Sequence, residues 1–311
     1  MERLTTIEQV RATVAAARAD GRRVGFVPTM GALHAGHLAL VREAAARADV
    51  VVVSIFVNPR QFDRPDDLAA YPRDLAGDEA QLAALGDAAP AYVFAPDVDE
   101  LYPRPPVTTV TVAELTDRLC GASRPGHFDG VATVCTKLFS VVQPDVAVFG
   151  RKDFQQLRVV QRVVADLDLP VEVVGGPTVR EEDGVALSSR NRRLDVDQRR
   201  AARALSQALR AGVEAARATR VDGLLPVPDA VRTAVAGTLA AAPGIDVDYV
   251  EVLDPDTLTP PSDGSARGEG DADATGALLA AVAAFVGPVR LIDNVVIGDE
   301  DDEARLLAAT G

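Results

Sequence analysis

The chain has 311 residues, of which 48% are hydrophobic, and its formal net charge is −14 at pH 7. A chain of this length can bury a large core and would form one large domain or two of medium size. Its acidic balance argues against a broad nucleic-acid-binding surface, because contact with a phosphate backbone needs a basic face.

The cysteine content indicates a reducing environment. Only Cys120 and Cys135 occur, without metal-ligand spacing or a framework of pairs, and we interpret both as buried thiols. No apolar run approaches the roughly 18 residues that a membrane span needs. We therefore expect a cytoplasmic protein with neither a membrane nor a nucleic acid as its partner.

The beginning of the chain is amphipathic and charged, which predicts a first helix with Thr6 as its N-terminal cap. Short apolar runs then alternate with helical patterns as far as about residue 175. The continuous Val/Ile run at 50–57 is typical of a parallel strand that is covered on both faces. Strands are predicted at 22–27, 50–57, 91–94, 107–112, 145–149 and 171–174, and helices at 37–48, 78–85, 131–142 and 154–167.

This alternation predicts an α/β fold, a Rossmann-like doubly wound parallel sheet, which we place in a domain of residues 1–180. In such sheets ligands bind beyond the carboxyl ends of the strands. Each polar motif described below follows a strand-like run. We therefore expect these motifs to gather at one edge of the sheet.

A smaller α+β domain is predicted for residues 181–311. Residues 260–276 are rich in Gly, Asp and Ser and low in apolar residues, which predicts a flexible surface loop. The acidic run at 299–303 is expected to form a solvated C-terminal face. Helices are predicted at 197–219 and 229–242, and strands at 247–253 and 289–292.

The segment FVPTMGALHAGH, residues 26–37, is the first chemical motif. His34 and His37, two of the three histidines of the chain, lie three residues apart around Gly36, where a predicted strand leads into a helix. Backbone N–H groups and the helix dipole favour an anion at such a position, and phosphate is the obvious ligand. Two imidazoles can bond phosphate oxygens and stabilise the charge that develops when an α-phosphate is attacked. Two alternatives remain. One is a metal site, although two histidines without a third ligand make a poor zinc site. The other is that both histidines are purely structural.

Two further motifs follow along the first domain. Residues 124–130, RPGHFDG, place Arg124 and His127 in a predicted ligand-facing loop before a helix at 131. Residues 149–156, FGRKDFQQ, carry Lys152, which can reach a phosphate, and Gln156, which can hold a hydroxyl or a carboxylate. A solvated Lys–Asp pair is the alternative for this second motif.

The last motif lies at the predicted domain junction, where Arg180 and the run Leu187-Ser188-Ser189-Arg190 form a polar loop. Two hydroxyls and a guanidinium suit phosphate recognition, although a helix cap also explains the serines. Arg124, Lys152, Arg180 and Arg190 all fall within these motifs of an acidic chain. This coincidence favours a single anion-binding site over four unrelated surface charges.

Longer blocks of the sequence occur in unbroken order between about residues 25 and 294: PTMGALHAGH, SIFVNPRQF, YPRDL, RPGHFDGVATV, FGRKDFQQL, TVREEDGVALSSRN and RLIDN. Together they closely resemble the pantothenate synthetases, a family of pantoate–β-alanine ligases in the HxGH nucleotidyltransferase superfamily. The HxGH element alone would indicate only a nucleotidyltransferase or a class I aminoacyl-tRNA synthetase. A different HxGH nucleotidyltransferase and a catalytically inactive nucleotide-binding regulator are the alternatives.

The resemblance implies a reaction in two steps. The carboxylate of pantoate attacks the α-phosphate of ATP in the presence of Mg²⁺, giving pantoyl adenylate and pyrophosphate. The amine of β-alanine then attacks the acyl carbon, releasing pantothenate and AMP. The resemblance also implies a homodimer formed through the first domain and a second domain that acts as a lid.

The resemblance assigns site residues one by one. Catalytic roles fall on His37, which the family treats as the proton donor, on His34 and on Lys152. Residues 187–190 match a mobile loop that closes over the triphosphate. The residues that match ATP contacts are Pro28, Thr29, Met30, Gly31, His34, Gly36, His37, Gly150, Lys152, Asp153, Val179, Leu187, Ser188, Ser189 and Arg190.

Gln61 and Gln156 match the glutamines that hold pantoate, and Gln61 also matches a contact with β-alanine. Tyr71, Arg124 and His127 match polar positions around the same cavity.

Two departures from the family pattern stand out. Gly77 precedes Asp78 where some members place two adjacent acidic residues near the metal. We therefore expect Mg²⁺ to be coordinated mainly by ATP phosphates and water rather than by the protein. Arg151 stands where relatives often carry Glu or Gln, which adds a local positive charge.

Overall fold

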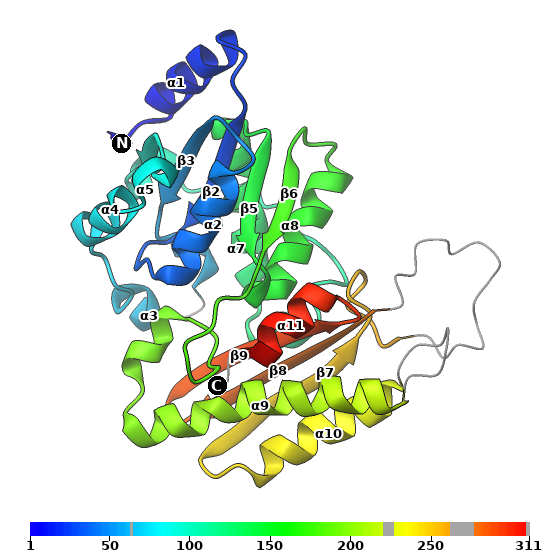
Figure 1. Cartoon of the computed structure of the whole chain (residues 1–311). Coiled ribbons are helices and arrows are strands. Elements are labelled where there is room, and N and C mark those ends of the chain that lie inside the picture. Colours follow the sequence, from blue (N-terminus) through cyan, green and yellow to red (C-terminus); the bar gives the residue numbers. More distant parts are fainter. Residues whose placement is uncertain (63–64, 220–226, 262–276, 309–311) are drawn as a thin grey trace, which may run out of the picture. The chain divides into compact units, whose positions relative to one another are not determined.

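A computed structural model describes residues 1–62, 65–219, 227–261 and 277–308, and the chain divides into two compact units, Met1–Pro177 and Thr178–Gly311. Most of the loop predicted at 260–276 lies outside these described residues. Within them, we find no helix with the length and apolar character needed to cross a membrane. Each unit is described separately below (Figure 1).

The first unit contains a six-stranded sheet in the order β1-β4-β3-β2-β5-β6, and every pair of neighbouring strands is parallel. The doubly wound parallel sheet predicted from the sequence is therefore confirmed. The strand β1 was not predicted because three residues are too few to show a period. The strands are β1 (Glu2–Leu4), β2 (Val24–Thr29), β3 (Val50–Ile55), β4 (Tyr92–Phe94), β5 (Val146–Gly150) and β6 (Glu172–Gly176).

Helices connect these strands. The first begins after Thr6, whose hydroxyl accepts a hydrogen bond from the backbone N–H of Gln9 in a capping box, as predicted. The helices are α1 (Ile7–Ala19), α2 (Ala35–Ala45), α3 (Pro65–Ala69), α4 (Leu75–Ala83), α5 (Val98–Leu101), α6 (Leu119–Ser123), α7 (His127–Val142) and α8 (Phe154–Asp166).

Both faces of the sheet are covered, which explains the continuous apolar strands. In β2, Val27 belongs to a buried cluster with Leu40 and Val41 of α2. Its neighbour Phe26 contacts the ring of Phe139 in α7, with centroids 6.4 Å apart. Successive strand residues point to opposite faces, so α2 and α7 cover different sides of the sheet.

Two predictions in this unit are wrong. Residues 107–112 form no strand: Val107 is 99% exposed, and the N–H of Val110 donates to the Thr133 hydroxyl of α7 instead of to a sheet neighbour. Prolines at 105 and 106 precede this segment and cannot donate to a ladder. The second error concerns residues 127–130, which form the first turn of α7 rather than a loop, because Gly126 with φ +77° ends the loop just before them.

The second unit contains an antiparallel sheet in the order β7-β8-β9 (Figure 1). Together with its helices it makes the predicted smaller α+β fold. Strand β8, with the sequence LLAAVAAFV, was not predicted, because it is almost wholly buried and lacks the alternation of a half-exposed strand. The elements are α9 (Val196–Thr219), α10 (Pro228–Ala241), β7 (Ile245–Leu253), β8 (Leu278–Val286), β9 (Val289–Ile297) and α11 (Glu300–Ala308).

The acidic run at 299–303 is not a wholly solvated face, contrary to the prediction. Asp302 and Glu303 are only 6% and 8% exposed. Asp302 accepts a hydrogen bond from the N–H of Val296 at 2.8 Å, and Glu303 accepts one from Gly298 at 2.8 Å. Glu303 also pairs with Arg217 of α9 at 2.7 Å. Both carboxylates, in the first turn of α11, therefore satisfy backbone donors at and just after the end of β9.

Candidate active site

Three polar segments follow three neighbouring strands of the parallel sheet. Residues 30–37 follow β2, residues 58–61 follow β3, and residues 151–156 follow β5. Because the strands are parallel and β2 lies between β3 and β5, these segments share one edge of the sheet. The chain winds from β2 to β3 and β4 in one direction, and β5 and β6 lie on the other side. The segments therefore lie at the topological switch point, where doubly wound sheets bind ligands.

His34 is the N-terminal cap of α2. Its Nδ1 accepts a hydrogen bond from the N–H of Gly36, with the two nitrogens 3.2 Å apart. An accepting Nδ1 carries no proton, so the proton of this ring is on Nε2. The ring of His37 lies beside it, with centroids 4.1 Å apart. The two imidazoles are therefore adjacent at the start of α2, and Nε2 of His34 is a hydrogen-bond donor.

His37 is neutral at physiological pH. Burial, the largest cause, and the neighbouring groups His34 and Lys152 together lower its pKa to about 3, although Asp153 acts in the opposite direction. Its Nδ1 is buried and has no hydrogen-bond partner among the residues that the structure describes. His37 as a whole is partly exposed. A neutral imidazole beside a second one can donate or accept a hydrogen bond without placing a full charge at the site.

Asp78 of α4 holds the loop between β2 and α2. Its two carboxylate oxygens accept hydrogen bonds from the N–H groups of Ala32, at 2.9 Å, and Leu33, at 2.7 Å. Ala32 adopts a left-handed φ of 52°, and a Cβ at Gly31 would lie 2.7 Å from the Asp78 carboxylate. Gly31 is therefore needed where the backbone approaches this side chain so closely. No local sequence pattern indicates this role for Asp78.

The same contacts bear on a protein-bound Mg²⁺. Both oxygens of Asp78 face backbone donors, and it is only 3% exposed. Within the described ranges, no group of three or more His, Cys, Asp or Glu side chains could hold a metal ion. The Asp78 carboxylate therefore binds the backbone of the loop, and these residues do not fit a protein-ligated Mg²⁺.

Gln61 is held at the end of β3 from several sides. Its side-chain amide contacts Met30 Sδ at 3.0 Å and accepts a hydrogen bond from Asn58 Nδ2 at 3.0 Å. Its backbone carbonyl lies 2.8 Å from Nδ1 of His127 and 3.2 Å from Nη2 of Arg124. The end of β3 is thus joined to the β2 loop and to the start of α7.

Arg124 and His127 support each other as well as Gln61. Arg124 Nη1 lies 3.1 Å from His127 Nε2, and since a guanidinium can only donate, this Nε2 accepts. Nδ1 of His127 then carries the proton and donates to the carbonyl of Gln61. The structure therefore places Arg124 and His127 against the Gln61 backbone, at the buried side of the site.

Asn58 is a site residue that sequence reasoning missed. It is 1% exposed, and its Nδ2 also donates to the carbonyl of Gly130 at 3.0 Å. Its Oδ1 accepts from the hydroxyl of Tyr102 at 3.1 Å. The available signal is its place, as a polar residue between the end of a buried strand and Pro59.

The segment after β5 carries Lys152, Asp153 and Gln156. Lys152 Nζ lies 3.9 Å from Asp153 Oδ2, and its side chain is 16% exposed. Gln156 lies in the first turn of α8 and is partly exposed, whereas its neighbour Gln155 is 6% exposed. Gln155 bonds the N–H of Cys120 at 3.0 Å and two carbonyls, those of Leu115 and Arg118, at 2.8 Å each. The two adjacent glutamines therefore differ: Gln155 stabilises the segment around α6.

The other predicted residues of the first unit lie around these three segments. Thr29, at the end of β2, donates to the carbonyl of Ser54 at 2.7 Å and accepts from the N–H of Gly31 at 3.2 Å. The ring of Tyr71 packs edge-on against Phe62, with centroids 5.6 Å apart. Pro28 is in β2, Gly150 ends β5, and Gly36 is in the first turn of α2.

Val179 and residues 187–190 belong to the second unit. The N–H of Leu187 donates to the carbonyl of Val179 at 2.9 Å. Ser188 caps the short 3₁₀ helix η4 (Ser189–Arg193), and its hydroxyl accepts from the N–H of Arg190 at 3.3 Å. The helix-cap alternative therefore holds for Ser188, while Arg190 is exposed.

Arg180 does not belong to an anion-binding set, contrary to the prediction. Its guanidinium makes two hydrogen bonds to Asp293, at 2.6 and 3.0 Å, and a third to the carbonyl of Gly184 at 3.2 Å. The side chains of this ion pair are 4% and 2% exposed. Arg180 is therefore part of the buried framework of the second unit.

Comparison with known proteins gives consistent matches over nearly the whole chain. Residues 2–296 match the family model described as pantoate-beta-alanine ligase. The chain is 49% identical over 301 residues to pantothenate synthetase from Moorella thermoacetica, covering 97% of this chain and 100% of that protein.

Solved structures agree with these matches. A pantothenate synthetase structure from Thermus thermophilus aligns with a TM-score of 0.83 at 44% identity, covering 95% of this chain and 99% of that one. A pantoate-beta-alanine ligase from Francisella tularensis, in complex with beta-gamma ATP and beta-alanine, aligns with a TM-score of 0.72 at 30% identity, covering 95% and 97%.

Proposed function

The chain belongs to the pantoate-beta-alanine ligase family, and we propose that the site at the ends of β2, β3 and β5 catalyses the ATP-dependent joining of pantoate to β-alanine. The products are pantothenate, AMP and pyrophosphate. The observation that carries this proposal is the family match over residues 2–296, which includes every site residue named above. ATP and β-alanine are the ligands of the Francisella tularensis relative.

In the first step, a carboxylate oxygen of pantoate attacks the α-phosphorus of ATP. A new P–O bond forms to the carboxylate, the bond to the β-phosphate oxygen breaks, and pyrophosphate leaves with that electron pair. The added negative charge falls on the α-phosphate oxygens. We assign Nε2–H of His34, the ring of His37 and the ammonium of Lys152 to stabilise that charge. The loop from Met30 to His37, with Pro28, Thr29, Gly150 and Asp153 around it, would hold the rest of the nucleotide.

A neutral His37 suits this role. Two adjacent imidazolium ions would repel each other across 4.1 Å, whereas neutral rings each offer one N–H without that cost. The lowered pKa of His37, about 3, favours such a neutral donor. We therefore interpret the histidine pair as a preorganised hydrogen-bonding surface rather than as a charged acid.

In the second step, the amine of β-alanine attacks the acyl carbon of pantoyl adenylate, and AMP leaves as the C–O bond to phosphate breaks. No protein nucleophile is required, so catalysis rests on placing the reactants and stabilising charge. We assign Gln61 and Gln156 to pantoate, and Gln61 also to β-alanine. Tyr71, Arg124 and His127 would border this part of the site, and the last two residues would fix Gln61 through its carbonyl.

The remaining assignments follow from the family. Ser188, Ser189 and Arg190, with Leu187 and Val179, would contact ATP phosphates, and residues 181–311 would act as a lid over the 1–180 catalytic domain. Mg²⁺ would arrive with the nucleotide as MgATP, since the described side chains do not form a site for it. We also propose a cytoplasmic homodimer, which sedimentation of the purified protein would test.

Isotope transfer tests the adenylate step directly. Pantoate labelled with ¹⁸O in its carboxylate should give AMP that carries one ¹⁸O per turnover, because the attacking oxygen stays on phosphorus when the acyl carbon is released. AMP without label would exclude carboxylate attack on the α-phosphate, and label in pyrophosphate would place the attack elsewhere on the triphosphate.

A further inference from the structure

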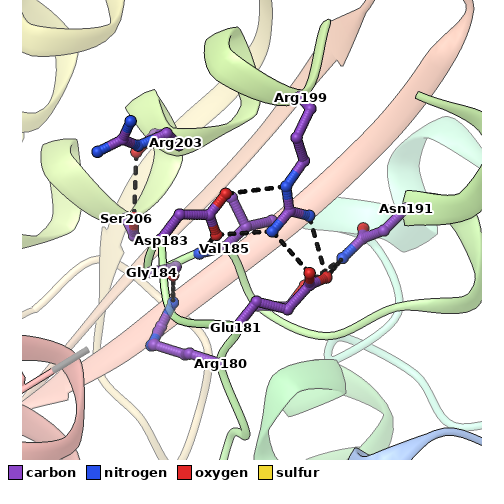
Figure 2. Close-up of polar contacts among 10 residues, drawn as sticks. Arg180, Glu181, Asp183, Gly184, Val185, Asn191, Arg199, Arg203 and Ser206 are labelled. Atoms are coloured by element: carbon purple, nitrogen blue, oxygen red, sulfur yellow. Dashed lines mark hydrogen bonds and ion pairs between the residues drawn. The ribbon is translucent and has the colours of Figure 1, made fainter. Parts of the chain in front are cut away.

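We propose that Arg199 of α9 is a positioning residue for the loop at 187–191, acting through the side chains of Glu181 and Asn191. This inference rests on the proposed role of Ser188, Ser189 and Arg190 in binding ATP phosphates. Arg199 lies outside the sequence motifs that carried the functional prediction. Figure 2 shows its guanidinium between Glu181 and Asp183.

The guanidinium of Arg199 binds two carboxylates at once. Its Nε and Nη2 donate to the two oxygens of Asp183, at 2.9 and 2.6 Å. Its Nη1 donates to Glu181 Oε1 at 3.0 Å, and Nη2 lies 2.8 Å from Oε2 of the same side chain. The planar fork of an arginine permits this double contact, which a lysine ammonium cannot reproduce.

Glu181, which Arg199 holds in place, contacts the loop at 187–191. Its Oε1, the atom bound by Arg199, also accepts a hydrogen bond from Asn191 Nδ2 at 2.9 Å (Figure 2). Asn191 Nδ2 donates further to the carbonyl of Ala186 at 3.1 Å, and its backbone N–H donates to the carbonyl of Ser188 at 3.0 Å. Asn191 thus connects the two ends of the loop at 187–191 by hydrogen bonds. Arg199 holds the carboxylate of Glu181, which in turn orients Asn191.

The turn at 181–185 does not depend on Arg199 for its own backbone. The N–H of Glu181 donates to the carbonyl of Val185 at 2.9 Å, and the N–H of Gly184 donates to the carbonyl of Glu181 at 2.8 Å. The side chains of Arg199, Glu181 and Asp183 are 24%, 35% and 30% exposed, so none of them is part of the buried core. Partly exposed ion pairs contribute little to stability. The main consequence of these contacts is therefore the orientation of Glu181.

Charge gives a second reason for the arrangement. Glu181 and Asp183 are anionic side chains close to a loop that would receive a triphosphate. The Arg199 cation compensates both charges, so its loss would leave two carboxylates without a neighbouring cation and would weaken the attraction of this region for an anion. Replacement of Arg199 by lysine would keep the positive charge and lose the forked hydrogen bonds. This variant therefore distinguishes the effect of the charge from the effect of the hydrogen-bond geometry.

The test compares Arg199→Ala and Arg199→Lys with Arg200→Ala. Arg200 is the next residue of the same helix, 74% exposed, and pairs only locally, with Asp197, in the contacts seen. We expect Arg199→Ala to lower kcat/KM for ATP by roughly 10- to 100-fold, as for other small displacements of positioned groups, with the KM for pantoate nearly unchanged. Arg199→Lys should recover part of this loss, and Arg200→Ala should match the unmodified enzyme.

Two further variants make the test specific. Asn191→Ala should reproduce the ATP effect, and the double variant Arg199→Lys with Asn191→Ala should be no worse than Asn191→Ala alone, because lysine keeps the charge and the geometric effect of Arg199 reaches the loop through Asn191. Additive losses would contradict the proposed chain of contacts. A kcat/KM for ATP in Arg199→Ala equal to that of Arg200→Ala would overturn the proposal.

Arg190→Ala separates this inference from the function on which it rests. If Arg190→Ala leaves kcat/KM for ATP unchanged, the phosphate-binding role of the loop fails, and the inference fails with it. If Arg190→Ala weakens ATP use while Arg199→Ala does not, only the positioning role is wrong. Thermal unfolding of each variant, expected within about 2 °C of the Arg200→Ala control for a change well under 1 kcal/mol, excludes a general loss of structure.

Discussion

The N–H of Gly36 donates a hydrogen bond to Nδ1 of His34 across 3.2 Å, which leaves the ring proton of His34 on Nε2. This backbone contact fixes the tautomer of one imidazole of the candidate site before any substrate binds. The second imidazole, of His37, lies with its centroid 4.1 Å away and is neutral. Together they form a pair of uncharged donors at the N-terminus of α2, where the helix dipole already favours phosphate.

The low pKa of His37 predicts a measurable titration. The chain has three histidines, so NMR can follow each imidazole separately. We expect His37 to stay neutral at least down to pH 5, since burial lowers its pKa to about 3. A resonance of His37 that titrates near the unperturbed value of about 6.5 would contradict this account.

The same shift affects stability. An unfolded chain protonates His37 near pH 6.5, whereas the folded chain resists protonation until about pH 3. The unfolded state therefore binds more protons across that window, and the contribution of His37 to the free energy of unfolding falls as the pH falls from about 6.5 toward 3. The difference in stability between pH 7 and pH 5 should be smaller in His37→Gln than in the parent protein.

Removal of the His37 side chain should reduce turnover without unfolding the protein. We expect His37→Ala to lower kcat by about 10²- to 10³-fold, the range for loss of one charge-stabilising donor. The effect should appear in pyrophosphate release during the first turnover, because the assigned role belongs to the adenylation step. A variant that keeps near-full turnover would remove His37 from the mechanism.

Asp78 provides a test of loop positioning against metal binding. Asp78→Asn replaces one accepting oxygen with an amide that faces a backbone N–H, so we expect a loss of about 1–3 kcal/mol in unfolding free energy and a higher KM for ATP. The Mg²⁺ concentration for half-maximal rate at saturating ATP should not change. The neighbouring variant Glu79→Gln, which alters only a surface pair with Arg3, is the matched control. A large shift in the Mg²⁺ requirement would instead identify Asp78 as a metal ligand.

The adjacent glutamines Gln155 and Gln156 should behave differently. Gln156→Ala should raise the KM for pantoate far more than that for ATP, because its assigned contact is with the acid. Gln155→Ala should mainly lower the unfolding temperature, since it removes three hydrogen bonds, those to the Cys120 N–H and to the carbonyls of Leu115 and Arg118. Equal effects of Gln156→Ala on both substrates would refute its assignment.

Much of the fold could be predicted because its strands are continuous apolar runs and its helices are periodic. The prediction of strands failed where the local sequence pattern did not match the tertiary contacts that the segment makes. Residues 107–112 look like a strand, but prolines precede them and Val110 bonds α7 instead. Strand β8 is buried so completely that its alanines and leucines show no alternation.

The motifs of the candidate site could be predicted from the sequence, but the side chains that hold its loops in place could not. His34, His37 and Lys152 stand out as polar residues after apolar strands. Asp78 binds the N–H of Leu33 and Arg199 binds the carboxylate of Glu181, both well outside the local sequence of the side chain concerned. No local sequence pattern predicts such partners. Arg180 shows the converse error, since a motif arginine proved to be buried against Asp293.

The most direct test of the central claim is AMP formation with ATP, Mg²⁺, pantoate and β-alanine, with each component omitted in turn. We predict sustained AMP release only in the complete mixture. Omission of β-alanine should leave a single burst of pyrophosphate, equal to the enzyme present, as pantoyl adenylate forms once and stays bound. AMP formation that continues at full rate without pantoate or without β-alanine would contradict the account.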